Sequence, residues 1–271
     1  FRRVLFRSYA ISTKVDTKER LAMNKYERGT LIESVCSDGH NWSDKPNNTL
    51  VNAYYNGSIG KLTIDFNADL FFTNDNTHQL MKETANTTDR DIESVTTSKN
   101  NMAATKLVLA YPIWKGMLNI GTEETFIERD NTNNSQGTGL PNSTSKVNDK
   151  TYAAFIQYGV ALNAKTQASL GLRYEHADFD YKDMLNPADN MERSYDNIFP
   201  SASISTLIGK TRIALAYSSR TQRPSLGQLN NSMMYHNRFV VQQGNPKLKP
   251  SIENNVSLTT MFSMFTDRKS V

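Results

Sequence analysis

The feature that most constrains this chain is a two-residue alternation of apolar and polar side chains. Between Leu62 and Phe72 every second residue is apolar, while the residues between them include Asp65 and Asp69. The same rhythm returns over residues 151–162, 168–175, 201–208 and 212–218. Successive side chains of a β-strand point to opposite faces, so this pattern predicts strands with one apolar and one polar face. Because helical periodicity is hardly visible, we expect an all-β fold.

The connections between the predicted strands alternate between short and long. Short reversals rich in turn residues lie at residues 56–58, 112–116, 163–165 and 209–210. Long polar connections cover roughly residues 74–100, 130–149, 177–197 and 220–250. Long structureless loops are uncommon in compact soluble domains, whereas transmembrane β-barrels combine short turns at one end with long loops at the other. We therefore predict an antiparallel up-and-down transmembrane β-barrel, present in part, with roughly nine to ten strands of a larger barrel.

Strand length and aromatic placement agree with a membrane barrel. An apolar band about 25 Å tall, crossed by tilted strands, requires roughly 9 to 11 residues per strand. Aromatic residues lie near both strand ends, as two interfacial girdles would require: Tyr54, Tyr55, Tyr111 and Trp114 beside short turns, and Phe71, Phe72, Phe126, Tyr152, Tyr174 and Phe199 near the long connections. One strand fits badly, because Glu123 and Glu124 are adjacent. One of them must face lipid unless a bulge intervenes or the strand has already left the membrane.

The polar faces of the strands would line the lumen of such a barrel. A charge that faces lipid at the midplane costs about 2–4 kcal/mol for Arg or Lys, so these residues require a hydrated interior. The lumen-facing candidates are Lys61, Asp65, Asp69, Gln157, Arg173, Glu175 and Arg212. The simplest interpretation is an ordinary wetted wall, and the alternative is contact with a transported solute or a plug.

Composition excludes several other classes. The chain has 271 residues, 38% of them hydrophobic, and its longest apolar run, residues 107–114, falls short of the roughly 18 residues of a membrane-spanning helix. Aromatic residues make up 10% and the net charge is only +4, which argues against disorder. The basic residues are scattered, so we expect no nucleic-acid partner.

No catalytic or metal motif is evident. Cys36 is the single cysteine, and the four histidines are far apart in the sequence: His40, His78, His176 and His236. Neither a nucleophile motif nor a glycine-rich phosphate loop occurs. We therefore expect no enzyme activity, no metal site and no cofactor.

The last quarter of the chain carries a more specific pattern. Residues 219–230 read Ser-Arg-Thr-Gln-Arg-Pro-Ser-Leu-Gly-Gln-Leu-Asn, and residues 242–250 read Gln-Gln-Gly-Asn-Pro-Lys-Leu-Lys-Pro. Together they resemble the strand-loop-strand signature of TonB-dependent outer-membrane receptors, in the branch known as the outer membrane protein β-barrel family. The signature residues are Arg220, Arg223, Pro224, Gly244, Asn245, Pro246, Leu248 and Pro250. The family places an acidic residue directly after the last proline, whereas here Ser251 and Ile252 precede Glu253.

The signature residues themselves look structural. Pro246 and Pro250 hold the chain extended before the strand that follows, and Gly244 permits a reversal of the backbone. The resemblance implies the wall of a barrel that in the family has about 22 strands, together with a plug domain, a TonB-type energy transducer and outer-membrane lipid as partners. It also implies active uptake of a scarce nutrient, such as a siderophore, glycan or peptide, in a Gram-negative outer membrane.

Two alternatives remain open at this stage. One is a non-transport outer-membrane barrel, an adhesin or a structural protein, and the other is a soluble β-sandwich binding module with two packed sheets. Residues 9–266 are expected to be the barrel fragment. Both ends look foreign to it, so residues 1–8 and 267–271 are expected to be non-native flanks.

Overall fold

The computed structural model describes residues 3–44 and 46–262. Almost all regular structure is antiparallel β-strand: β1 (Arg3–Ile11), β2 (Asp16–Glu27), β3 (Thr30–Ser43), β4 (Asn47–Ile59), β5 (Leu62–Ala85), β6 (Arg90–Ile113), β7 (Gly116–Gln136), β8 (Ser143–Asn163), β9 (Thr166–Asp183), β10 (Met191–Ile208), β11 (Thr211–Gln222), β12 (Met233–Asn237), β13 (Val240–Gln243) and β14 (Ser251–Phe262). The helical pieces are η1 (Pro187–Asp189) and α1 (Leu226–Leu229). No helix in the described part of the chain is long and apolar enough to cross a membrane.

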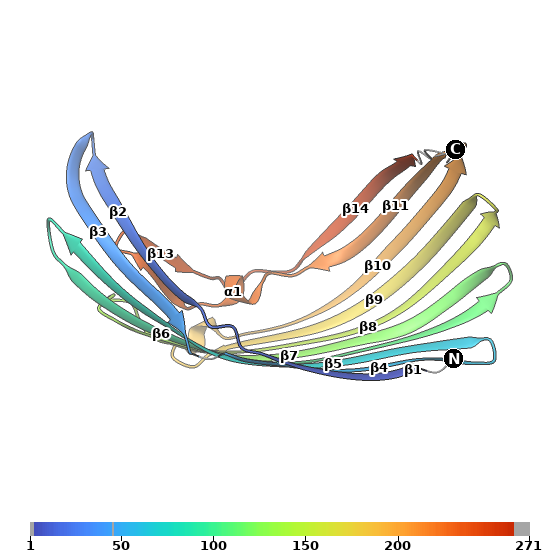
Figure 1. Ribbon diagram of the computed structural model, residues 1–271, viewed down its shortest axis with the longest axis horizontal. Helices are drawn as coiled ribbons and strands as arrows, with labels where there is room; N and C mark the ends of the chain where they lie inside the picture. Colours follow the sequence, from blue (N-terminus) through green and yellow to red (C-terminus); the bar gives the residue numbers. More distant parts are fainter. Residues whose placement is uncertain (1–2, 45, 263–271) are drawn as a thin grey trace, which may run out of the picture.

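Twelve strands form one sheet that curves into an open trough (Figure 1). From β4 to β11 each strand pairs with its neighbours in sequence, and β1 and β14 lie at the two edges. This arrangement confirms the prediction of an antiparallel up-and-down barrel wall. The described residues form one large curved sheet and a two-stranded ribbon, an arrangement that differs from the two packed sheets of the soluble sandwich alternative. The small β12–β13 ribbon lies on the concave side.

The first four strands of the sheet form one long hairpin. One arm consists of β1 and β2, the other of β3 and β4, and each arm is interrupted between its two strands. β2 pairs with β3, and β1 pairs with β4. β3 and β4 pair with the same edge of β5. β4 pairs with the half of β5 beside the short turn, and β3 pairs with the half farther from that turn. Residues 3–8 are thus part of a paired strand, and the boundary expected at residue 8 stays a prediction. The second expected flank, residues 267–271, lies outside the described residues.

The predicted long loops are mostly strand. β5 continues to Ala85 and β6 already begins at Arg90, so most of residues 74–100 is paired backbone. The same correction applies to residues 130–149 and 177–197. Beyond the membrane both faces of a strand can be polar, and the alternation that marks a strand in the sequence disappears although backbone pairing continues. The first short turn is also displaced, to Gly60 and Lys61, where Gly60 adopts a φ of 60°.

An apolar belt covers the convex face in the halves of the strands beside the short turns. Leu170 and Ile208 are more than 60% exposed there, as lipid-facing side chains would be. β7 pairs with both neighbours without a bulge. Glu123 therefore faces the concave side, and Glu124 lies on the convex side, where its carboxylate accepts the hydroxyl of Thr105.

Glu124 lies at the upper edge of this belt. It pairs with Tyr152, whose ring makes an edge contact with Phe126 at 5.5 Å, so aromatic girdle residues surround it. Three predicted girdle residues are instead on the concave face. Tyr54 donates to Asp65, Phe199 is buried, and Phe71 shares the face of Asp69.

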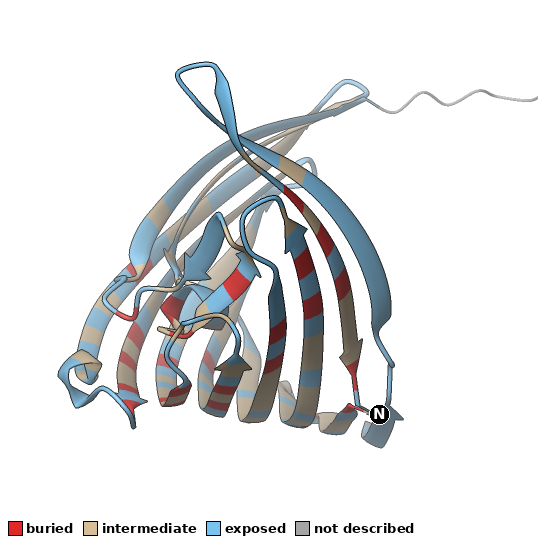
Figure 2. Cartoon of the chain, turned by 90° about the vertical axis from the view of Figure 1, so that its left-hand side faces the viewer, coloured by how far each residue is buried: buried red, intermediate tan, exposed pale blue. Residues whose placement is uncertain are grey.

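The residues between β11 and β14, 223–250, are termed the crossing segment. They contain α1, β12 and β13 and run across the concave side of the trough (Figure 1). Most buried residues lie beneath this segment, in the half of the sheet away from the short turns (Figure 2). Tyr235 of the segment packs on Met81 and Ile92 in the small hydrophobic core. The core of this chain therefore lies inside the trough.

Candidate functional site

A chain of ion pairs crosses the concave face of the sheet. Lys106 Nζ on β6 lies 2.7 Å from Glu123 on β7, and the same carboxylate lies 2.5 Å from Arg173 on β9. Arg173 also contacts Glu175 at 3.3 Å. Because alternate residues of each strand share a face, the two-residue rhythm places all four on one side. The predicted lumen residues Arg173 and Glu175 thus belong to one network.

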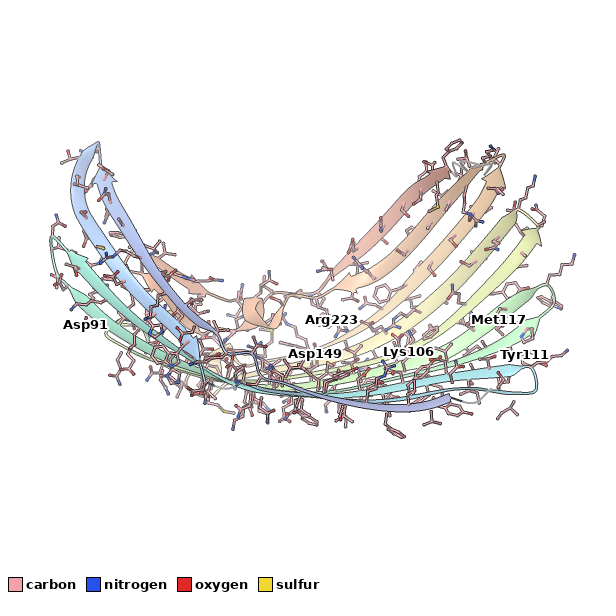
Figure 3. All side chains as sticks on the ribbon, viewed as in Figure 1. Asp91, Lys106, Tyr111, Met117, Asp149 and Arg223 are labelled. Carbon is pink, nitrogen blue, oxygen red and sulfur yellow. The ribbon has the colours of Figure 1, made fainter. Side chains whose placement is uncertain are left out.

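Arg223 extends this network to the crossing segment. Its guanidinium donates to Glu175 at 2.7 Å, to Asp149 at 3.1 Å and to the hydroxyl of Thr151 at 2.6 Å. Figure 3 labels Asp149 and Arg223 on the concave side of the sheet. Burial raises the pKa of Asp149, although Arg223 acts in the opposite direction. A sequence-predicted signature residue is therefore joined to two strands of the wall.

The two halves of the signature pack against each other. Asn245 donates its backbone N–H to Gln228 O at 2.6 Å, so Gly-Asn-Pro docks on the end of α1. A Cβ at Gly244 would lie 2.2 Å from Asn230 O, which leaves room only for glycine. Leu248 completes the turn by donating to Asn245 O at 3.1 Å. Together, these residues form the compact base of the crossing segment.

The other signature arginine joins two strands. Arg220 on β11 lies opposite Glu253 on β14, and their side chains pair at 2.9 Å. The acidic residue expected directly after Pro250 is thus found two positions later, in register with Arg220. Although the acidic residue is shifted from the position that the family pattern gives it, it still forms an ion pair between β11 and β14.

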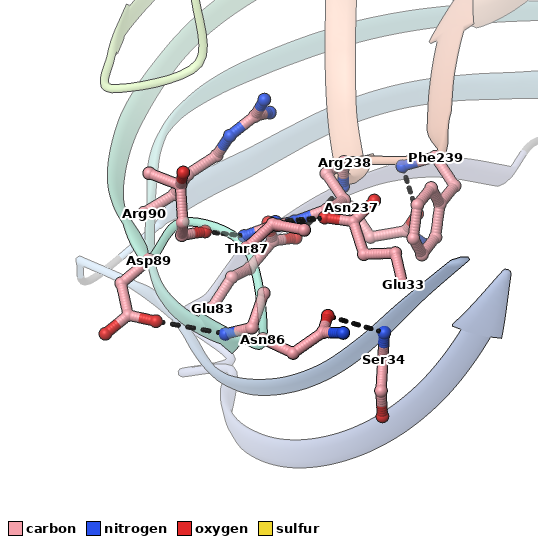
Figure 4. A network of polar contacts seen from close by, with 12 residues as sticks. Glu33, Ser34, Glu83, Asn86, Thr87, Asp89, Arg90, Asn237, Arg238 and Phe239 are labelled. Atoms are coloured by element: carbon pink, nitrogen blue, oxygen red, sulfur yellow. Dashed lines mark hydrogen bonds and ion pairs between the residues drawn. The ribbon is translucent and has the colours of Figure 1, made fainter. Parts of the chain in front are cut away.

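Arg238 fastens the far end of the crossing segment (Figure 4). Its buried guanidinium contacts Glu83 at 2.9 Å and Glu33 at 2.6 Å, and it donates to Thr88 O at 2.7 Å. Tyr235 donates to the same Glu83 at 3.0 Å. Burial alone would lower the pKa of Arg238, but the two carboxylates raise it on balance. These four side chains are termed the Arg238 clasp: Arg238, Glu83, Glu33 and Tyr235.

The remaining lumen candidates lie apart from this network. Asp65 and Asp69 are on the concave face of β5. Asp65 accepts a hydrogen bond from the Tyr54 hydroxyl at 2.7 Å, and Asp69 accepts one from Asn52 Nδ2 at 2.7 Å. Gln157 is exposed on β8, and Arg212 is exposed with Ser205 Oγ at 3.5 Å. Lys61 lies in the turn, not on the strand as predicted, because that turn begins later than expected.

Several central residues were not predicted from the sequence. Asp149, Glu83 and Arg238 lie in segments interpreted as polar loops. Arg238 is 155 positions from Glu83 and 205 from Glu33, so no local spacing could have indicated the clasp. Within residues 3–44 and 46–262, no three His, Cys, Asp or Glu side chains gather as a metal site would require.

An apolar convex belt, a charged concave face and short turns at one end define a segment of an outer-membrane β-barrel. Comparison with family models gives the same result over most of the chain. Residues 58–267 match the model of the outer membrane protein beta-barrel family, and the chain belongs to that family. The prediction of family and fold is confirmed, and the protein is located in the outer membrane of a Gram-negative bacterium.

Solved structures are similar to this chain at low sequence identity, and one of them has a TM-score above 0.5. The copper transporter OprC has a TM-score of 0.52 and 11% identity, with 98% of this chain and 52% of that chain covered. The siderophore receptor PiuA from Acinetobacter baumannii has a TM-score of 0.49 and 10% identity, with 97% of this chain and 53% of that chain covered. The ferric yersiniabactin uptake receptor FyuA from Yersinia pestis has a TM-score of 0.48 and 12% identity, with 96% of this chain and 48% of that chain covered. The chain spans about half the length of these structures, and no curated protein matches its sequence.

Proposed function

We propose that this chain forms part of the wall of a TonB-dependent receptor for active uptake of a scarce nutrient across the outer membrane. The observation that carries the proposal is the crossing segment, fixed by buried ion pairs across a charged concave face in a protein of the outer-membrane barrel family. A wall that only had to separate lipid from water would not require this internal structure.

The proposal includes partners outside this chain. A plug domain and a TonB-type transducer would open the lumen, and outer-membrane lipid would cover the convex belt. Copper transport by OprC agrees with uptake of a small solute, but 11% identity supports a common fold alone. The nutrient is therefore left as a siderophore, glycan or peptide, and no enzyme activity is part of the proposal.

Deletion of the whole gene tests the proposed transport. Mutant, complemented and transducer-deficient cells would be given labelled iron chelates, glycans and peptides in separate assays. We expect one nutrient class to accumulate in complemented cells only while the transducer is functional. Unchanged accumulation of every class in the mutant, together with a loss of surface attachment, would support the adhesin alternative and contradict transport.

A further inference from the structure

Polar atoms without partners gather on the concave face of β5, β6 and β7. Five residues there have a side-chain atom that is buried and has no hydrogen-bond partner among the described residues: Asp75 Oδ1, Ser98 Oγ, Asn100 Oδ1, Arg129 Nε and Asn131 Nδ2. They are termed the inner polar cluster. Elsewhere in the described chain such atoms occur only on Asp180 and Tyr195. Buried polar groups are nearly always hydrogen-bonded, so five neighbouring exceptions require an explanation.

Strand register makes these residues one cluster. Ser98 lies directly between Asp75 and Asn131, and Asn100 lies opposite Arg129 in the next row. Directly opposite residues have Cβ atoms about 4.5–5.5 Å apart. Asn100 Nδ2 donates to Thr73 Oγ1 at 2.7 Å, which leaves its carbonyl oxygen as the unpaired group. Asn131 is 5% exposed.

Arg129 differs from the other arginines of the concave face. Arg173, Arg223 and Arg238 each contact carboxylates at 3.1 Å or less. Arg129 has no carboxylate partner in the described residues, and burial lowers its pKa. Among the described side chains, four other arginines of this face also lack a carboxylate. Arg7, Arg90 and Arg212 are exposed to solvent, and Arg193 donates to the backbone carbonyls of Lys247 and Leu248. Arg129 is therefore a half-buried cation without a countercharge.

The cluster lies at the edge of the crossing segment. One row above Asn131, Asn133 Nδ2 donates to Met233 O at 3.1 Å, so the segment passes directly over the wall there. Ser145, which lies opposite Asn131, contacts Asn230 of the segment at 3.5 Å. The cluster therefore lies in the wall beside the crossing segment, on the side that faces the interior of the trough.

We infer that the inner polar cluster binds the carboxylate or phosphate group of a solute in the lumen. Arg129, Asn131 and Ser98 supply donors to the oxyanion, and a guanidinium forms strong charge-assisted bonds with such groups. Asn100 and Asp75 supply acceptors for a hydroxyl or ammonium group next to it. The inference names a solute class for the proposed uptake function and rests on that function for the presence of solute in the lumen.

Thermal unfolding of the full-length protein, purified from outer membranes in detergent, tests this inference. Malate and inorganic phosphate are the probes, with sodium chloride at equal ionic strength as the reference. We expect both probes to raise the Tm of the wild-type protein. Arg129→Gln should weaken the apparent probe affinity roughly 10–100-fold, as expected for the loss of charge-assisted hydrogen bonds.

Two further variants keep the result interpretable. Arg212→Gln makes the same charge change on the same face and should leave the probe effect unchanged, while Arg129→Lys should retain part of it. Failure of both probes to raise the wild-type Tm, or an equal effect in Arg129→Gln, overturns the inference. Loss of probe binding in Arg129→Gln without any uptake defect in the gene deletion would support the anion site and refute the proposed transport.

Discussion

Replacing Arg238 by methionine should release the crossing segment from the sheet. The change removes the ion pairs at 2.9 Å to Glu83 and 2.6 Å to Glu33, and it leaves the fully buried Glu83 without its cation. Breaking a buried pair in this way costs about 3–5 kcal/mol. Glu83 keeps its hydrogen bonds from the Tyr235 hydroxyl and from the backbone N–H of residue 238. We therefore expect a loss of stability near the lower end of this range, about 3 kcal/mol.

Amide hydrogen exchange of β12 and β13 in the full-length protein measures this opening. A loss of about 3 kcal/mol corresponds to exchange that is roughly 100-fold faster in these strands. The double variant Arg238→Met/Glu83→Gln should recover much of the loss, because it leaves no buried charge behind. Arg20→Met is the matched control: Arg20 pairs with Asp38 at 2.6 Å, but both side chains are more than half exposed. Its effect on exchange in β12 and β13 should be small, because solvent screens the exposed pair.

Two results would refute this reasoning. If Arg238→Met exchanged as slowly as Arg20→Met, the clasp would not hold the segment. If the double variant were as destabilised as the single one, the loss would come from packing around residue 238 and not from the unpaired Glu83. Unchanged exchange in the belt strands would show that the effect is local.

Three further measurements test other parts of the structure. The Thr87 hydroxyl and Arg238 lower the pKa of Glu33. The contribution of Glu33 to folding stability is therefore complete above the ordinary glutamate pKa of 4.5, and it is lost as the pH falls through the lowered pKa. The protection factors of the β12 amides, which correct for the slower intrinsic exchange in acid, should therefore fall as the pH is lowered, and constant protection factors from pH 6 to pH 3 would contradict this role. Gly244→Ala should cost about 1–3 kcal/mol because its Cβ would meet backbone carbonyls, whereas Gly227→Ala has open space; equal unfolding midpoints in urea would disprove the tight fit. Leu170→Arg on the belt should lower folding stability in lipid vesicles by about 2–4 kcal/mol, while Gln157→Arg on the concave face stays near wild type; the reverse order would invert the assigned faces.

The membrane half of the fold could be predicted from the sequence because lipid and water impose opposite demands on alternate residues. The run from Leu62 to Phe72 shows this plainly, because the structure places its alternate apolar residues on the convex face of β5 and Asp65 and Asp69 on the concave face. The outer half could not be predicted in the same way. After Phe72 the convex face meets water instead of lipid, and the concave face carries polar residues such as Asp75 and Glu83 beside the apolar Met81. Residues 74–85 therefore carry no alternation, although residues 74–83 pair with β6.

The candidate site was accessible only in part. Arg173 and Glu175 alternate with apolar neighbours on one strand, so the sequence pattern indicates their face. Arg223 belongs to a recognisable motif, but its partner Asp149 is 74 positions away. Contacts at such separation depend on how strands from different parts of the chain are brought together, and no local pattern encodes them.

The crossing segment also sets an order of assembly. Its contacts reach back 205 positions at Glu33, 155 at Glu83 and 74 at Asp149. Contacts of such high contact order form slowly, because a large loss of chain entropy precedes them. The segment can acquire its final position only after β3, β5 and β8 are in place. Docking of β12 and β13 is therefore a late kinetic step, and a chain interrupted before it would present an assembled wall with an uncovered interior.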